Sequence, residues 1–283
     1  VNVNTVPPTA AGSIVSLVGL QNGGTDISTE AGNVGIPDIV GNLRVDQAWG
    51  SAQIMGALHD VRAGFYPGST AVAFGNPSDA WGWAVGGGVQ VNLPMLGKGD
   101  VASIAANYCQ GASRYCSNPN GGVRGAGNLY ALTSGHTVGF GNLDDAYFST
   151  TGAGTGTGLQ LPTAWNIAGG VAHKWNGQWQ TSLYAGYLSY KANSTSVDAF
   201  CAATAGVSAT GCRDFTAWQV GSRTLWNPVA NLDVSVDLLY HKINGAMQGF
   251  VAATYVGQGP QPTVYGSVGV LSGIFRVQRN FWP

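Results

Sequence analysis

The sequence predicts an all-β fold, in which an antiparallel sheet crosses a membrane as a transmembrane β-barrel. Three observations support this prediction. Polar and apolar residues alternate along most segments, as they do in strands whose side chains point to opposite faces. Charged residues make up only 9% of the chain, against about 25% in a soluble domain, while glycine and aromatic residues are abundant. Short and long connections alternate, which is typical of a barrel with tight turns at one rim and long loops at the other.

The clearest alternation lies in residues 232–241. Leu232, Val234 and Val236 alternate with Asp233 and Asp237. A helix would place both aspartates on its apolar side, whereas a strand sends them to one face. The same pattern predicts about ten strands in all, which fall at residues 14–20, 39–46, 52–59, 81–92, 101–108, 164–174, 179–190, 216–226, 232–241 and 275–281.

The lengths of the connections predict which strand ends lie together at each rim of the barrel. Short turns are expected near residues 48–50, 94–99, 176–177 and 227–228. Long loops are expected at residues 21–35, 61–78, 110–159, 193–213 and 244–262, and the third of these has room for short strands at 128–133 and 137–140. Aromatic residues gather near the predicted strand ends, which predicts two girdles at the membrane–water boundaries.

The bulk composition excludes other classes of protein. The net charge is −1, so there is no basic excess for binding nucleic acid. No apolar run approaches the roughly 18 residues of a membrane-spanning helix, and residues 1–5 do not have the pattern of a signal peptide. No linker or composition break divides the chain, so a single domain over residues 1–283 is expected.

The four cysteines form two local pairs, Cys109 with Cys116 and Cys201 with Cys212. Each pair lies in a stretch rich in small residues, without zinc-site spacing and without a histidine cluster. We expect two loop disulfides formed in an oxidising compartment, and four free thiols are the alternative.

The alternation also predicts which residues face water in the channel. Opposed charges across a narrow channel would set up a transverse field that orders water and biases ion selectivity. For any single residue a solvated wall position is the simpler interpretation, and the arginines are the strongest candidates because they are always charged. The predicted pore-lining residues are Asn42, Arg44, Asp46, Gln53, His59, Gln90, Asn166, Lys174, Gln219, Arg223, Asp233, Asp237, His241, Arg276 and Gln278.

Catalytic and metal-binding motifs are weak in this sequence. There is no G-x-S-x-G motif, and the glycine-rich run at 154–158 has no P-loop lysine. Neighbouring strand residues such as His59 and Asp60 face opposite ways and cannot form a direct dyad. Asp144 and Asp145 are adjacent carboxylates in a loop, which is usually a solvated arrangement. We therefore expect no enzyme activity, no cofactor and no metal.

Several stretches resemble the alphaproteobacterial general porins of the rhizobial type. They are PDIVGNLRVDQAWGSAQIMGALHDV at 37–61, TAWNIAGGVAHKW at 163–175, TSLYAGY at 181–187, TLWNPVANLDVSVDLLY at 224–240 and FRVQRNFWP at 275–283. The resemblance implies a trimeric outer-membrane barrel of about sixteen strands, in contact with lipid and lipopolysaccharide. Counted back from the last strand, the family's first strands and its inward-folded third loop have no counterpart, so we expect the chain to lack the N-terminal part of the barrel.

The leading hypothesis is therefore a porin for passive diffusion of small hydrophilic solutes and ions. An outer-membrane barrel hydrolase is one alternative and predicts a serine and a histidine on the same face at girdle level. A β-rich surface adhesin or binding protein is the other, and it predicts release from membranes without detergent.

Overall fold

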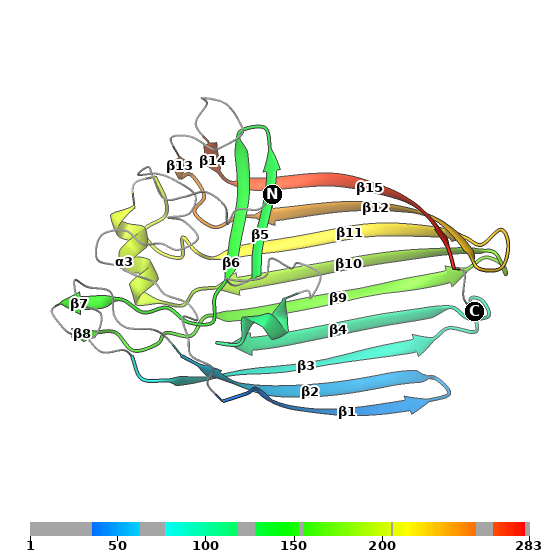
Figure 1. The fold of residues 1–283 in the computed structure, drawn as a ribbon, viewed down its shortest axis with the longest axis horizontal. Helices are drawn as coiled ribbons and strands as arrows, with labels where there is room; N and C mark the ends of the chain where they lie inside the picture. Colours follow the sequence, from blue (N-terminus) through cyan, green and yellow to red (C-terminus); the bar gives the residue numbers. More distant parts are fainter. Residues whose placement is uncertain are drawn as a thin grey trace.

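The structure, a computed structural model, describes residues 36–62, 77–117, 128–152, 155–204, 206–252 and 263–280. One large antiparallel sheet dominates it, and smaller elements gather at one end of the long strands (Figure 1). None of the helices in this part of the chain is long and apolar enough to span a membrane.

The large sheet has nine strands, each hydrogen-bonded to the next in the order β1-β2-β3-β4-β9-β10-β11-β12-β15. The order follows the chain, so the sheet is a meander in which every pair is antiparallel. Its strands are β1 (Ile39–Gln47), β2 (Gly50–Val61), β3 (Ala80–Asn92), β4 (Val101–Gln110), β9 (Thr163–Lys174), β10 (Trp179–Lys191), β11 (Phe215–Trp226), β12 (Leu232–Asn244) and β15 (Ser267–Arg279).

All nine of these strands were predicted from the sequence. The further strand predicted at 14–20 lies outside the described residues. The last strand begins at Ser267, not at residue 275, because Gly269, Ser272 and Gly273 blur the polar–apolar contrast on which the prediction rests.

The connections sort by length as predicted. The four short turns lie together at one end of the sheet, and the longer connections lie at the other (Figure 1). The longer connections hold η2 (Ser113–Cys116), β5 (Asn128–Ser134), β6 (Thr137–Leu143), β7 (Thr150–Gly152), β8 (Thr155–Gly156), α3 (Thr195–Ala203), β13 (Val251–Ala252) and β14 (Thr263–Tyr265).

Helix α3 corrects the expectation of an irregular loop over 193–213. Ser194 caps its N-terminus, with the hydroxyl accepting a hydrogen bond from the Val197 amide at 3.2 Å. Asp198 adds an acidic side chain to the first turn, which stabilises the helix dipole. The helix has only nine residues and lies in a stretch rich in small and polar residues, and for this reason the capping pattern was not recognised in the sequence.

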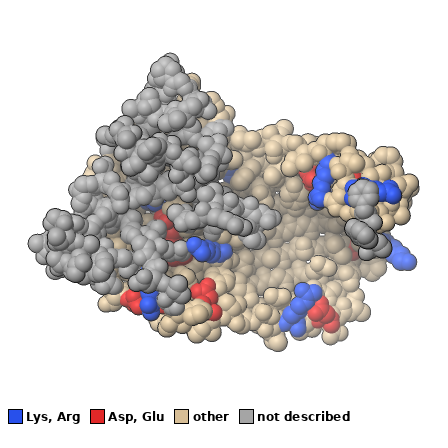
Figure 2. Space-filling model, in the orientation of Figure 1, with Lys and Arg blue, Asp and Glu red and all other residues tan. Residues whose placement is uncertain are grey.

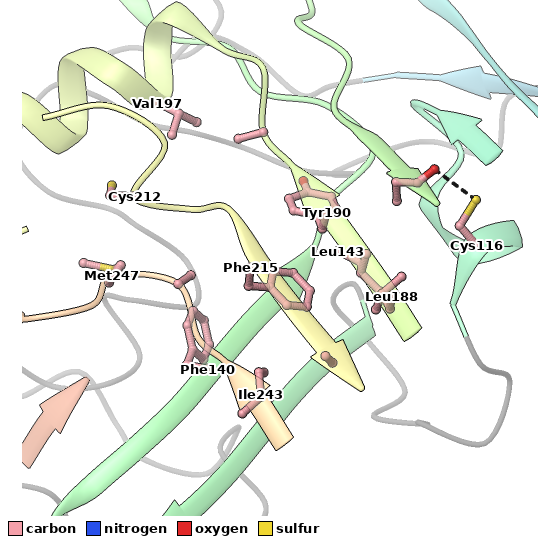
Figure 3. Close-up of a cluster of buried hydrophobic side chains, with 14 of the residues drawn as sticks. Cys116, Phe140, Leu143, Leu188, Tyr190, Val197, Cys212, Phe215, Ile243 and Met247 are labelled. Carbon is pink, nitrogen blue, oxygen red and sulfur yellow. Dashed lines mark hydrogen bonds between the residues drawn. The ribbon is translucent and has the colours of Figure 1, made fainter. Parts of the chain in front are cut away.

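A compact core joins the long connections to the adjacent ends of the strands. Phe215 of β11 and Ile243 of β12 pack with Phe140 of β6, while Val197 and Met247 approach from the neighbouring connections (Figure 3). These side chains are all less than 9% exposed. The apolar core of the molecule therefore lies among the long connections, and the rest of the sheet has two accessible faces.

Candidate functional site

The pairing register defines two faces of the sheet, because residues directly opposite each other in an antiparallel pair point the same way. Arg223 pairs with Asp237, and Asp233 pairs with Gln278. Following the register from strand to strand places the predicted pore-lining residues on one face, here called the polar face: Asn42, Arg44, Asp46, Gln53, His59, Gln90, Asn166, Lys174, Gln219, Arg223, Asp233, Asp237, His241, Arg276 and Gln278.

The opposite face, here called the apolar face, carries exposed large hydrophobic side chains. Leu238 is 54% exposed and Phe275 is 69% exposed. Aromatic pairs bridge neighbouring strands on this face near both ends. Trp179 and Trp226 stack at 5.5 Å beside the short turns, and three tilted pairs lie toward the long connections: Trp83 with Tyr108, Trp165 with Tyr187, and Trp218 with Tyr240. This arrangement fits aromatic rings held at two membrane boundaries.

On the polar face, charged side chains pair within the wall. Arg44 Nη2 lies 2.7 Å from Asp46 Oδ1 in β1, and Arg223 Nε lies 3.6 Å from Asp237 Oδ2 across β11 and β12. The guanidinium of Arg276 also donates to the Gln278 side chain. These contacts lie toward the short-turn ends of the strands, where charge compensates charge locally.

His59 belongs to a second polar group, near the long connections. Its Nδ1 lies 2.7 Å from Asp38 Oδ1, and its Nε2 lies 3.8 Å from Asp145 Oδ2. The Tyr115 hydroxyl donates to Asp38 Oδ2 at 2.6 Å. Partial burial alone would raise the pKa of Asp38, but the hydrogen bonds from His59 and Tyr115 outweigh it, so this pKa is lowered. Burial, with the neighbouring Asp38, raises the pKa of Tyr115 to about 12.

A buried ion pair among the long connections was missed from the sequence. Asp144 is 1% exposed and Arg213 is 3% exposed, and Arg213 Nη2 donates to Asp144 Oδ2 at 3.1 Å. The Tyr147 hydroxyl and the Asn142 amide also donate to this carboxylate, at 2.8 and 2.6 Å. Burial raises the pKa of Asp144 although Arg213 opposes the change. Adjacent aspartates in a loop suggested solvated side chains, and only the tertiary structure reveals their burial.

Both cysteine pairs form disulfides, with sulfur–sulfur distances of 2.07 Å for Cys109–Cys116 and 1.98 Å for Cys201–Cys212. The first ties η2 to the end of β4, and the second ties α3 to the segment leading into β11. The first bond fastens a long connection to the sheet, and the second closes a loop within the connection between β10 and β11.

The β5–β6 hairpin lies on the polar face and crosses the ends of several strands (Figure 1). A side chain at Gly139 would overlap Ile243 of β12 and come within 3.2 Å of Val268 Cβ in β15, and both of these residues belong to the polar face. Segment η2 also covers this face, because the Asn166 amide of β9 donates to the Cys116 carbonyl. Connections from one end of the sheet therefore fold back over the polar face.

Between these connections and the short turns, the polar face is hollowed. The hollow has a volume of about 630 Å³ and spans β1 to β11, with Gln53, Gln90, Asn107, Tyr184 and Gln219 among its lining residues. Figure 2 looks onto this face, whose centre is tan, while blue and red side chains lie toward the strand ends. Within the described ranges, no group of three or more His, Cys, Asp or Glu side chains is arranged to hold a metal ion. The site is thus a broad polar wall with room for water and small solutes.

Comparison with known proteins identifies the family. No curated protein matches the chain. Among solved structures, it is similar to the outer membrane channel DcaP of Acinetobacter baumannii, with 13% sequence identity, a TM-score of 0.46, and coverage of 89% of this chain and 53% of that chain. The chain thus spans about half the length of that channel. The family model described as Porin subfamily matches residues 8–261, which is most of the chain, and the protein therefore belongs to this porin family.

Proposed function

We propose that this protein forms a water-filled channel through which small hydrophilic solutes and ions diffuse passively. Its family places it in the outer membrane. The observation that carries the proposal is the separation of the two faces across all nine strands. In a bilayer, lipid would contact the apolar face, and water would contact the polar face with its predicted pore-lining residues.

The hollow and the folded-back connections support the same function. A lumen filled by packed side chains could not conduct, whereas this polar face keeps an open volume beside uncharged amides. The β5–β6 hairpin narrows the space over β12 and β15 and, through β6, also contacts β11 at the edge of the hollow. We infer a pore wall with one narrowed sector and no enzymatic role.

The two edge strands of the sheet, β1 and β15, indicate how the barrel is completed. Within the described ranges, β1 pairs with β2 alone and β15 pairs with β12 alone. An unpaired strand edge cannot face hydrocarbon, because its backbone groups would lose their hydrogen-bond partners. We propose that residues 1–283 belong to a single porin domain, a barrel of about sixteen strands in which further strands pair with both edges.

The partners follow from this proposal. A homotrimer in contact with outer-membrane lipid and lipopolysaccharide, without nucleic acid, is what the resemblance to the rhizobial-type alphaproteobacterial porins implies. The low charge of the chain supports extensive contact with lipid, and the net charge of −1 does not favour nucleic acid.

Planar-bilayer recording of the purified full-length protein tests the proposed function. We expect stepwise currents that rise in proportion to voltage in potassium chloride. Heat-unfolded protein from the same preparation is the matched control and should give no steps. Folded protein that inserts without conducting would contradict the channel proposal.

A further inference from the structure

The central part of the polar face is a hydrogen-bonding surface without free charge. Among the described residues that line the hollow, Arg44 alone is charged, and its guanidinium is already bound to both carboxylate oxygens of Asp46, at 2.7 to 3.0 Å. The pair formed by Arg223 and Asp237 lies beyond the lining. An ion entering the hollow would therefore meet no free counter-charge among these residues.

An aromatic ring lies against this wall. Tyr184 of β10 pairs with Gly221 of β11, and a side chain at Gly221 would overlap the Tyr184 ring. The ring therefore extends sideways across the glycine, and it also lines the hollow. A ring lying along the wall presents an apolar π-face toward the solute.

Amide side chains share the hollow with this ring and retain their hydrogen-bonding capacity. Gln219 lies diagonally across from Tyr184, with its Cγ 3.7 Å from the position that a Cβ of Gly186 would take. Gln53 and Gln90 line the same hollow. In the described part of the chain, the side chains of these three glutamines have no hydrogen-bond partner. Each amide can both donate and accept, so each can serve a hydroxyl group in either role.

We propose that the hollow is a passage site for neutral polyhydroxylated solutes, that is, for sugars, with the Tyr184 ring as its stacking surface and Gln219 as a hydrogen-bonding partner. A sugar ring combines an apolar C–H face with a rim of hydroxyl groups, which matches an aromatic face bordered by amides. This inference rests on the proposed channel function and names the solute class of the same wall.

Current blockage by a sugar in single full-length channels tests the inference. The neutral trisaccharide raffinose is added to one side, and the duration of each blockage is measured in potassium chloride. Tyr184→Ala should shorten the blockages about fivefold, as expected for loss of one aromatic contact, whereas Tyr184→Phe should preserve them. Gln219→Leu, similar in size but without the amide, should also shorten them.

Two comparisons make the test specific. Tyr187→Ala removes a tyrosine from the apolar face of the same strand, where it pairs with Trp165, and should leave blockage durations unchanged. Trigalacturonate has the same number of sugar rings but carries carboxylates, and it should block for a shorter time than raffinose.

Two results would overturn the solute class: blockages as long with Tyr184→Ala as in the native channel, or as long with trigalacturonate as with raffinose. Channels that conduct potassium chloride but never show raffinose blockage would also overturn it, while leaving the channel function standing. Absence of any conductance would instead reject the proposed function.

Discussion

Arg213 and Asp144 form an ion pair that holds two long connections together, each side chain being at most 3% exposed. Arg213→Met would leave a buried carboxylate without its cation, which typically costs about 3–5 kcal/mol of unfolding free energy. Because burial already raises the pKa of Asp144, the variant should fold with uptake of a proton at this site. The loss of unfolding free energy in the variant, relative to the native protein, should therefore grow as the pH rises above 3.8, the ordinary pKa of aspartate. Urea unfolding in detergent, followed by tryptophan fluorescence at several pH values, measures this.

The double variant Arg213→Met, Asp144→Asn provides the control for the ion pair. It removes the charge that Arg213 compensates while keeping a side chain of the same shape, so it should recover part of the lost stability. If the effects of the two single substitutions simply add, the residues are not coupled and the predicted role of the pair is wrong.

Asp38 has the opposite pH dependence, because its pKa is lowered by contacts with His59 and Tyr115. A carboxyl with a lowered pKa in the folded state stabilises the protein above its unfolded pKa, near 3.8, and loses this effect as the pH falls through the folded value. Asp38→Asn should therefore flatten the acid side of the melting-temperature profile. Circular dichroism melts in detergent across this range measure it, and His59→Ala should flatten the profile less. Unchanged acid sensitivity in Asp38→Asn would contradict the assignment.

At the scale of elements, the β5–β6 hairpin is the connection whose position should control conductance most directly. Gly139→Val would force its new side chain into Ile243 and Val268, so the hairpin must move off β12 and β15. We expect a larger single-channel conductance from a wider passage. Gly158→Ala is the control, since a Cβ there meets nothing within 4 Å. Equal conductance in Gly139→Val and the native channel would show that the hairpin does not narrow the pore.

The strands and their faces could be predicted from sequence because alternation is a local property. The segment around Asp233 and Asp237 contains its own signal, and so do the turns that sort to one end. The inward position of the hairpin could not be predicted, because it depends on packing between Gly139 and residues more than one hundred positions away. Tyr184 was missed for a local reason, because its neighbours on the same face, Ser182 and Gly186, are small and did not distinguish the two faces of the strand.

For the whole molecule, stability and function depend on keeping two solvents apart. The exposed hydrophobic side chains of the apolar face would be a liability in water, and the paired charges of the polar face would be costly in lipid. A soluble sheet protein buries one face in a core, whereas here the core is confined to the long connections. The orientation of each strand is therefore set by lipid on one side and water on the other.

Leu238 and Leu239 allow a direct test of that separation, because they are neighbours in the middle of β12 and point to opposite faces. Leu238→Arg would place a cation in the hydrocarbon, at a cost of about 2–4 kcal/mol near the bilayer centre. Leu239→Arg places the same side chain on the polar face, where water can solvate it. We expect Leu238→Arg to reduce the fraction of protein that folds into vesicles, measured as the heat-sensitive compact band in gel electrophoresis, while Leu239→Arg folds normally. Equal folding of the two variants, or a defect confined to Leu239→Arg, would mean that lipid does not contact the apolar face.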